Sequence, residues 1–267
     1  MQTVFLNQMR ENSYSMRESL RALKTNLQFC GDDIKTIMVT STAPSEGKST
    51  VVFELARSLT ESGKSVLIVD TDMRKSVLVG RLRAKAPSGK INGLSHFLSG
   101  QKKLAEVIYS TQVPRLYMVF AGPSVPNTTE ILEKQYFERL IESGRNNFDY
   151  ILIDCAPLGA VIDAAVIAKH CDGAIMIIAQ NQVGAKDILS AKKQLEASGV
   201  KILGAVLNKV KREKHTYGKS YGGYYGDYGK YGSYGSYGNY GTRDGEDYTI
   251  DLTEDDKKGK DRVEKKG

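Results

Sequence analysis

The sequence predicts an α/β fold built on a doubly wound, mostly parallel sheet, followed by a disordered C-terminal tail rich in tyrosine. Three observations support this prediction. Short apolar runs alternate with helical patterns, a phosphate-binding loop motif follows the first run, and the last part of the chain combines tyrosine with glycine and polar residues. A length of 267 residues, of which 40% are hydrophobic, is sufficient for one sizeable domain with extensions.

Six short runs of β-branched and other apolar residues are expected to form the strands of the sheet. They lie at residues 36–40, 65–69, 116–120, 150–153, 174–179 and 202–207. Strands that are buried on both faces have continuous apolar sequences, and the helices between them form right-handed crossovers. Together these features predict a mostly parallel sheet, which binds its ligands at the carboxyl ends of the strands.

One amphipathic helix is expected ahead of the first of these strands, over residues 14–29. Its apolar side is formed by Leu20, Leu23 and Leu27, and the basic residues near it are Arg17, Arg21 and Lys24. Because this helix lies outside the sheet pattern, we expect it to be free to contact a neighbouring molecule. We therefore divide the chain into an N-terminal segment (1–30), a central α/β domain (31–210) and a flexible tail (211–267).

A nucleotide-binding loop is predicted at residues 42–50, with an apolar helix that begins near Ser49. This strand, loop and helix are typical of a P-loop, whose backbone amides and helix N-terminus bind phosphates. Lys48 is expected to reach the β- and γ-phosphates, Ser49 to bind Mg²⁺, and Thr50 to lie near the α-phosphate. Thr42 replaces the usual first glycine, and a turn that matches by chance is the alternative. The residues assigned to nucleotide binding in this loop are Ser45, Glu46, Gly47, Lys48, Ser49 and Thr50.

Three aspartates at the ends of two further strands are expected where Mg²⁺ would bind. Asp70 and Asp72 are separated by one residue at the end of the run at 65–69, and Asp154 follows the run at 150–153. Acids at strand ends also cap turns and helices. Three of them together with a P-loop favour a nucleotide and Mg²⁺ site, in which Asp154 holds the metal through water.

The tail is distinguished by its tyrosines. Ten of the fifteen tyrosines lie between Tyr217 and Tyr248, and from Tyr225 to Tyr240 they recur at every third residue. A polar, glycine-rich segment buries too little apolar surface to offset its ordering entropy, so each phenol is expected to stay exposed, as a substrate requires. Taken alone, such repeats also serve adhesion and self-association.

Composition argues against several other classes of function. Cys30, Cys155 and Cys171 have neither CxxC spacing nor a neighbouring histidine cluster, so we expect reduced, structural thiols. No apolar run approaches the ~20 residues of a membrane span, and the start of the chain lacks signal-peptide features, so a cytoplasmic protein is expected. The net charge of +7 selects no partner, because basic and acidic residues are interleaved.

The sequence resembles the bacterial tyrosine kinases of capsule and exopolysaccharide operons, over nearly the whole chain. Residues 42–50 are similar to that family's Walker A motif, 70–74 to its Walker A′ motif, 151–157 to its Walker B motif, and the tail to its tyrosine cluster. Its connecting segments are similar to 93–100, to 122–127 with Glu130, and to 163–166. Glu18-x-x-Arg21-x-x-Lys24 resembles the ExxRxxR oligomerisation motif, although lysine loses the bidentate fork of arginine; an ordinary charged helix surface is the alternative.

The resemblance implies transfer of the γ-phosphoryl group of ATP, with Mg²⁺, to tail tyrosines of a neighbouring subunit. The acceptors assigned are Tyr217, Tyr221, Tyr224, Tyr225, Tyr228, Tyr231, Tyr234, Tyr237 and Tyr240. Because the pKa of tyrosine is about 10, transfer benefits from a carboxylate that orients or accepts the phenolic proton. Asp70 is the candidate for this role, and Asp72 shares the metal or positions Asp70; the two assignments can be exchanged.

The remaining assignments complete this predicted site. The metal ligands are Ser49, Asp72 and Asp154, and the catalytic residues are Lys48, Asp70, Asp72 and Asp154. Lys48 and the metal carry most of the charge stabilisation in the transition state. Asn208 stands where related ATPases contact adenine, and a turn residue at a strand end is the alternative.

The resemblance also implies partners. These are a transmembrane polysaccharide co-polymerase that activates the kinase, further copies of the chain in a homo-oligomer, and a protein-tyrosine phosphatase. The protein would then lie at the inner face of the cell membrane through its partner and regulate the synthesis and export of the polysaccharide.

Two other classes of function compete with a kinase. A partitioning or division-site ATPase switch would have the same fold, but that class carries a lysine where this chain has Ala43, and it often ends in an amphipathic membrane helix. A scaffold whose nucleotide only sets its assembly state is the third possibility. Nucleic acid is not expected as a partner, because no recognised nucleic-acid module or aromatic interleaving accompanies the basic residues.

Overall fold

The computed structural model describes residues 1–159 and 163–211. The predicted tail, apart from Lys211, lies outside the described residues, as do its predicted disorder and all nine tyrosines assigned as phosphate acceptors.

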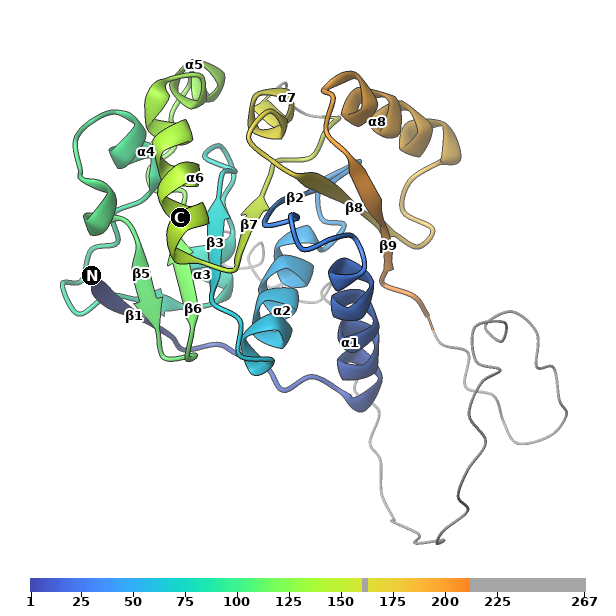
Figure 1. Cartoon of the computed structure of the whole chain (residues 1–267), viewed down its shortest axis with the longest axis horizontal. Helices are drawn as coiled ribbons and strands as arrows, with labels where there is room; N and C mark the ends of the chain where they lie inside the picture. The colour runs from blue at the N-terminus through green and yellow to red at the C-terminus, as the bar shows by residue number, and fades with distance from the viewer. Residues whose placement is uncertain (160–162, 212–267) are drawn as a thin grey trace, which may run out of the picture. The chain divides into compact units, whose positions relative to one another are not determined.

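The described residues form a nine-stranded sheet (Figure 1). Its strands are β1 (Gln2–Leu6), β2 (Thr36–Ser41), β3 (Val66–Asp70), β4 (Ala84–Lys85), β5 (Tyr109–Thr111), β6 (Leu116–Val119), β7 (Tyr150–Asp154), β8 (Gly173–Ala179) and β9 (Ile202–Asn208). They are arranged in the order β4-β1-β5-β6-β3-β7-β2-β8-β9. The six predicted strands form the continuous parallel part from β6 to β9. The predicted α/β fold with a mostly parallel sheet is therefore confirmed.

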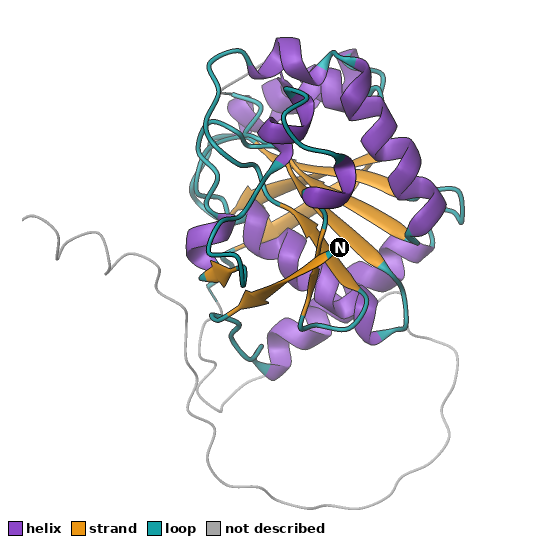
Figure 2. Ribbon diagram, turned by 90° about the vertical axis from the view of Figure 1, so that its left-hand side faces the viewer, coloured by secondary structure: helices purple, strands orange, loops and turns teal. Residues whose placement is uncertain are grey.

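Helices lie on both faces of this sheet (Figure 2). They are α1 (Tyr14–Gln28), α2 (Lys48–Glu61), α3 (Leu78–Arg81), α4 (Leu94–Leu98), α5 (Thr128–Leu132), α6 (Gln135–Asn147), α7 (Asp163–Ala168) and α8 (Ala185–Ala197), with a 3₁₀ turn at Leu104–Glu106. One hydrophobic core joins the sheet to α6, α7 and α8, and a second core joins its opposite face to α1 and α2. Two cores on opposite faces explain why the central strands are apolar at every position.

Three strands were missed by the sequence prediction, namely β1, β4 and β5. The N-terminal segment thus contributes a strand as well as the predicted helix, because β1 lies between β4 and β5. In β1, Val4 and Leu6 are buried while Phe5 is half exposed, so its pattern alternates over only a few residues. β4 and β5 have two and three residues. Runs this short carry too little periodicity to be recognised in a sequence.

The predicted N-terminal helix is confirmed as α1. Ser13 caps it by accepting a hydrogen bond from the backbone N–H of Met16 at 3.2 Å. Leu20 and Leu27 are buried, and the helix packs against α2. Only the outer side of α1 is thus available to a neighbouring molecule.

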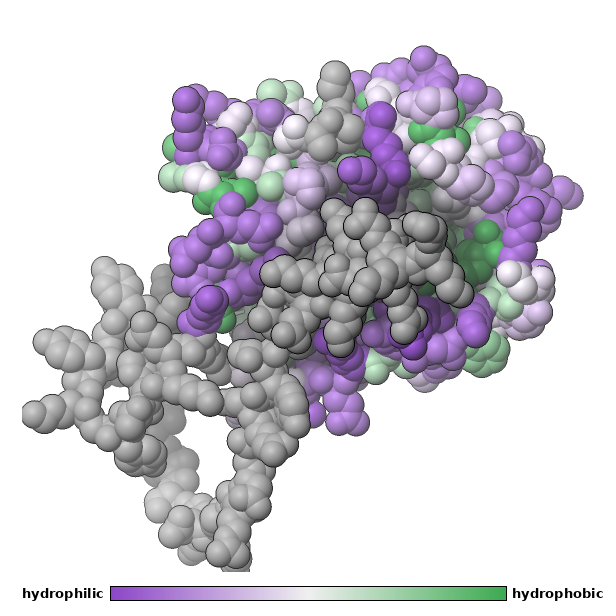
Figure 3. All heavy atoms as spheres, turned by 180° about the vertical axis from the view of Figure 1, so that it is seen from behind, coloured by the Kyte–Doolittle hydropathy of each residue, from purple (hydrophilic) through white to green (hydrophobic). Residues whose placement is uncertain are grey.

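The surface is polar where it can be followed on the face in Figure 3, with hydrophobic residues in small, separate patches. Within the described ranges, we find no helix with the length and hydrophobicity that a membrane crossing requires.

Candidate active site

The predicted P-loop connects β2 to α2. Gly47 precedes the first helical residue with φ 89°, and Ser45 has φ 63°. A Cβ atom on Gly47 would lie 2.2 Å from Nδ2 of Asn208, so both the backbone angle and the space require glycine here. Within residues 1–159 and 163–211, no side chain caps the N-terminus of α2, which leaves its first backbone N–H groups available to an anion.

Glu46 and Asn208 hold this loop in place. The buried Glu46 carboxylate accepts a hydrogen bond from the backbone N–H of Ala43 at 2.7 Å and another from that of Ala179 at 3.0 Å. The Asn208 side chain donates to the backbone oxygen of Glu46 at 2.9 Å. Both side chains therefore shape the P-loop itself. A contact of Asn208 with adenine, and of the Glu46 backbone with phosphate, stays a prediction.

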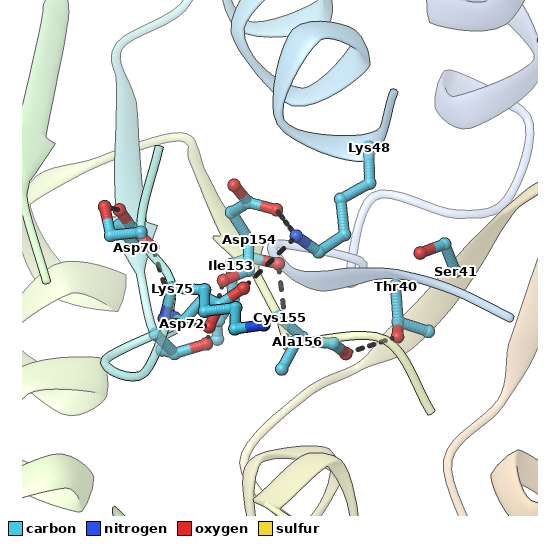
Figure 4. Close-up of polar contacts among 12 residues, drawn as sticks. Thr40, Ser41, Lys48, Asp70, Asp72, Lys75, Ile153, Asp154, Cys155 and Ala156 are labelled. Atoms are coloured by element: carbon cyan, nitrogen blue, oxygen red, sulfur yellow. Dashed lines mark hydrogen bonds and ion pairs between the residues drawn. The ribbon is translucent and has the colours of Figure 1, made fainter. Parts of the chain in front are cut away.

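The three predicted acids converge on Lys48 from two neighbouring strands. Asp70 and Asp154 are direct partners in the pairing of β3 with β7. The Lys48 ammonium, at the start of α2, lies 3.3 Å from Oδ1 of Asp154 and 3.8 Å from Oδ2 of Asp72 (Figure 4). Asp70 and Asp154 are each only 1% exposed. The structure thus brings together residues that lie far apart in the sequence.

The electrostatics of this group are unbalanced. Burial, reinforced by the charge of Asp154, raises the pKa of Asp70 to about 8. Burial also raises the pKa of Asp154, in spite of the nearby Lys48. For Lys48, burial disfavours the ammonium, but attraction by Asp154, Asp72 and Asp70 outweighs it and raises the pKa. One cation thus faces three acids in a desolvated space.

A divalent cation fits this arrangement. Oδ1 of Asp154 is buried; the Lys48 ammonium lies 3.3 Å from it, but no hydrogen bond of good geometry reaches it from the described residues. Ser49, which is 5% exposed, is the first residue after Lys48 and supplies a hydroxyl of the kind that Mg²⁺ takes from a P-loop. Carboxylate and hydroxyl oxygens are the donors that Mg²⁺ prefers. The chemistry of the donor set therefore agrees with the predicted ligands Ser49, Asp72 and Asp154.

The loop after β3 gives Asp70 and Asp72 different surroundings. Asp70 accepts hydrogen bonds from the Ser76 hydroxyl at 2.5 Å and from the backbone N–H of Asp72 at 3.1 Å. Asp72 accepts from the backbone N–H of Lys75 at 3.1 Å through one oxygen, while its other oxygen faces Lys48. Asp70 is thus held by its own loop, and Asp72 turns toward the P-loop.

Two contacts of the site had no signal in the sequence. Ser76 binds Asp70, as above, and Arg81 on α3 donates a hydrogen bond to the hydroxyl of Thr50 in the P-loop. Both depend on how the chain folds back after β3, which no motif encodes. The short helix α3 thereby adds a cation beside the residue predicted to lie near the α-phosphate.

A second network had only a partial signal, because its members lie within or directly after motif segments. Arg74 pairs with Asp163 at 3.4 Å and donates to the hydroxyl of Thr128 at 2.5 Å. Asp163 also accepts hydrogen bonds from Thr128 and Thr129, at 2.6 and 2.5 Å. The end of the loop after β3 is therefore tied to the starts of α5 and α7.

The residues predicted for oligomerisation lie apart from this site, on α1. Arg21 pairs with Glu18 at 2.6 Å, and both side chains are exposed. Lys24 donates a hydrogen bond to the hydroxyl of Ser62, the residue after α2, at 2.5 Å. Lys24 is thus engaged within its own chain, whereas Glu18 and Arg21 are presented to solvent.

The fold and this site define a P-loop nucleotide-binding protein of the α/β class. The AAA domain family matches residues 34–213. Over 207 residues, the chain is 43% identical to tyrosine-protein kinase CpsD of Streptococcus agalactiae, covering 78% of this chain and 89% of that protein. The chain therefore belongs to the AAA domain family and to the bacterial tyrosine-protein kinases, and it is an enzyme of that kinase class.

Solved structures agree with this assignment. The kinase domain of the Escherichia coli tyrosine kinase ETK is 29% identical, with a TM-score of 0.68, and the match covers 78% of this chain and 81% of that one. The chimerical protein CapA2B2 is 27% identical, with a TM-score of 0.71, over 78% of this chain and 93% of that one.

Proposed function

We propose that this kinase transfers the γ-phosphoryl group of ATP, with Mg²⁺, to the tail tyrosines of a neighbouring copy. The observation that carries the proposal is the position of Lys48, which extends from the P-loop helix to Asp154 at the end of β7 and to Asp72 in the loop after β3. Beside it, Asp70 is buried and held by Ser76. The acceptors are the nine tyrosines from Tyr217 to Tyr240 that the sequence assigns.

In the proposed reaction, the amides of the P-loop and the N-terminus of α2 bind the phosphates, and Lys48 compensates charge on the β- and γ-phosphates. Ser49, Asp72 and Asp154 would hold Mg²⁺, which supplies further charge compensation when bound. The phenolic oxygen attacks the γ-phosphorus, the bond to the β–γ bridging oxygen breaks, and ADP leaves. Asp70 receives the phenolic proton, a role for which its high pKa is suited.

The wider part of the proposal rests on the family resemblance and on the exposure of Glu18 and Arg21 on α1. Copies of the chain assemble through Glu18, Arg21 and Lys24, so that each site receives the tail of its neighbour. A transmembrane polysaccharide co-polymerase activates the kinase and holds it at the inner face of the membrane, and a phosphatase reverses the modification. The result is control of capsular or exopolysaccharide synthesis and export.

The direct test is phosphotyrosine formation by the purified full chain with ATP and Mg²⁺, alone and with the cytosolic segment of its membrane partner. Tail phosphorylation is expected in the parent and in the control Lys193→Met, a lysine on the exposed side of α8. It is expected to vanish in Lys48→Met. Hydrolysis of ATP without any phosphotyrosine, even with the partner segment, would instead support the ATPase switch.

Transfer between copies has its own test. Lys48→Met, which keeps its tail tyrosines, is mixed with an active chain whose tail tyrosines are all replaced by phenylalanine. Phosphotyrosine on the Lys48→Met chain supports transfer in trans. Phosphorylation of the parent that does not occur in this mixture would show that each chain modifies only itself.

A further inference from the structure

A cleft of about 740 Å³ opens beside the loop that carries Asp70. It is lined by residues of α3, β4, α4 and the segments near them. Those that matter for its chemistry are Ser76, Val79, Lys85, Lys90, Ile91 and His96. Apart from Ser76, which binds Asp70, none of these residues was assigned to the active site, and the cleft is large compared with a single side chain.

The cleft combines apolar and cationic groups. Val79 is a 38% exposed hydrophobic side chain, and Ile91 is half-buried. Lys85 and Lys90 are exposed, and neither has an ion-pair partner within residues 1–159 and 163–211. Such a surface suits a ligand with a flat apolar body and an anionic end.

The third titratable side chain that lines the cleft, besides the two lysines, is His96. Its Nδ1 accepts a hydrogen bond from the backbone N–H of Gly93 at 3.1 Å, so in the neutral ring the proton is on Nε2. Burial lowers the pKa of His96, and the charges of Lys90 and Lys102 lower it further. With a neutral histidine, Lys85 and Lys90 are the charged side chains among the described residues that line the cleft, so the cleft is positive.

The cleft adjoins the reaction site through Ser76. This residue lines the cleft, and its hydroxyl donates the 2.5 Å hydrogen bond to Asp70. A peptide that presents one tyrosine to Asp70 therefore passes next to the cleft. Tyrosines three residues apart in an extended chain are separated by about 10 Å.

The charge of the tail decides which form of it fits. Residues 217–240 contain two lysines, Lys219 and Lys230, and one acid, Asp227, which gives a net charge of 2 − 1 = +1. The unmodified repeat is therefore not attracted to a positive cleft. Each phosphate adds about −1.5 to −2 charges, so one modified tyrosine reverses the sign.

We propose that this cleft is a phosphotyrosine-binding site for the repeat of a neighbouring copy, with the ring on Val79 and Ile91 and the phosphate on Lys85 and Lys90. The inference rests on the proposed function, because the phosphotyrosine is its product. The first phosphate of a tail then keeps that tail at the cleft, and a tyrosine three residues away is presented to Asp70. Later phosphates are added faster than the first.

Binding of synthetic peptides tests the site without catalysis. The full chain carrying Lys48→Met is titrated with residues 228–240, either unmodified or phosphorylated at Tyr234. We expect the phosphopeptide to bind about tenfold more tightly. Adding Lys85→Gln and Lys90→Gln should remove that preference, whereas the control Lys193→Gln on α8 should retain it. Equal binding of the two peptides, or an unchanged preference in the double variant, would overturn the proposal.

Two further arms sharpen the test. A peptide with phosphoserine in place of Tyr234 keeps the charge but has no ring, so it is expected to bind more weakly than the phosphotyrosine peptide and more tightly than the unmodified one. Binding equal to that of the phosphotyrosine peptide would refute a phosphotyrosine site. Lys90→Gln alone covers the case in which the double variant fails to fold, and it should lower the preference severalfold.

A kinetic measurement then separates this inference from the proposed function. In the active full chain, mass spectrometry follows the number of phosphates per tail. The variant with Lys85→Gln and Lys90→Gln should add its first phosphate at the parental rate and accumulate singly modified tails. If the parent forms no phosphotyrosine, the proposed function fails, while the peptide titration still reports on the cleft. An unchanged distribution of phosphates in the variant would contradict the inference.

Discussion

The two edges of the parallel sheet, where its strands begin and where they end, carry aspartates in opposite surroundings. At the carboxyl ends, Asp70 and Asp154 are buried next to each other, and the pKa of each is raised. At the amino ends, Asp149 precedes β7 and Asp172 precedes β8, and the pKa of each is lowered. The residue type is identical, so the difference lies in how deeply each carboxyl group is buried and in its partners.

The amino-end acids are satisfied by the strands that they join. Asp172 accepts hydrogen bonds from the backbone N–H groups of Lys35 and Thr36, at 2.9 and 2.7 Å, and from Arg145 at 2.5 Å. Its partial burial works against ionisation, but these three donors outweigh burial and lower the pKa. Such a carboxylate stabilises the fold and leaves little capacity for a ligand.

The carboxyl-end acids lack this compensation. Lys48 is shared between Asp154 and Asp72, and its ion pair with the buried Oδ1 of Asp154, at 3.3 Å, is not supported by a well-formed hydrogen bond from the described part of the chain. The folded protein therefore keeps an unfavourable cluster that a nucleotide and its metal would relieve. An acid whose charge is left uncompensated marks a binding site, whereas a fully bonded acid marks a structural joint.

The largest effect should follow from Lys48→Met, which removes the shared cation. Phosphotyrosine formation should fall by about 10³-fold. In EDTA without nucleotide, the free energy of unfolding should fall by about 3 kcal/mol, because a buried carboxylate loses its counter-charge. Urea titration at neutral pH measures this loss. Adding Asp154→Asn to Lys48→Met should restore most of the stability and none of the activity. If Lys48→Met alone is as stable as the parent, the acids at the carboxyl ends of the strands do not depend on Lys48, and the contrast with the acids at the amino ends is refuted.

Asp154→Asn alone should separate activity from stability. Kinase activity should fall by about 10²-fold, since a neutral amide replaces the carboxylate that faces Lys48 and is proposed to bind the metal. The ligand-free protein should be as stable as the parent or more stable by about 1 kcal/mol, because a buried, poorly compensated charge is removed while Lys48 keeps Asp72 and Asp70. Thermal unfolding in EDTA distinguishes this from a structural acid, whose loss would lower the melting temperature.

The sequence was sufficient for the part of the fold that is buried on both faces. Strands such as β3 and β7 are continuous apolar runs, because burial on both faces requires an apolar residue at nearly every position. It was insufficient at the side of the sheet where β1, β4 and β5 lie. There the strands are held by pairing with distant segments, for example Leu6 of β1 with Ala84 of β4, and such pairing leaves little trace in two to five residues.

The candidate site divides in the same way. Lys48, Asp70, Asp72 and Asp154 were predictable because each follows directly on a recognisable strand or loop, and parallel strands bring their carboxyl ends together. Ser76 and Arg81 were not, since their contacts with Asp70 and Thr50 depend on the return of the chain through α3. The raised pKa of Asp70 was equally hidden, because it reflects burial and the position of Asp154.

At the amino ends, Asp172→Asn should lower stability by about 1.5 kcal/mol at pH 7 and leave the activity of the folded enzyme unchanged. Because the folded-state pKa of Asp172 lies below the ordinary value of 3.8, the contribution of its charge is complete at neutral pH. It is lost as the pH falls through that lowered pKa. Urea titrations at pH 7 and at acidic pH should show the difference between parent and variant shrinking. A constant difference would mean that shape, and not charge, is lost.

The smallest effect should come from Asp149→Asn, which tests whether exposure limits a satisfied acid. Asp149 accepts hydrogen bonds from the backbone N–H and the hydroxyl of Ser65, both at 2.7 Å, but it is exposed, and among the described residues it pairs with no arginine. Asparagine keeps one acceptor oxygen, so the loss should be only about 0.5 kcal/mol. Combining Asp149→Asn with Ser65→Ala should lower the stability little further, because both changes disrupt the same hydrogen bonds between the starts of β3 and β7. A loss of stability as large as that of Asp172→Asn would show that the hydrogen bonds to the backbone at the start of a strand matter more than the ion pair of Asp172 with Arg145. The contrast between the aspartates at the two ends of the strands would then depend on hydrogen bonding alone.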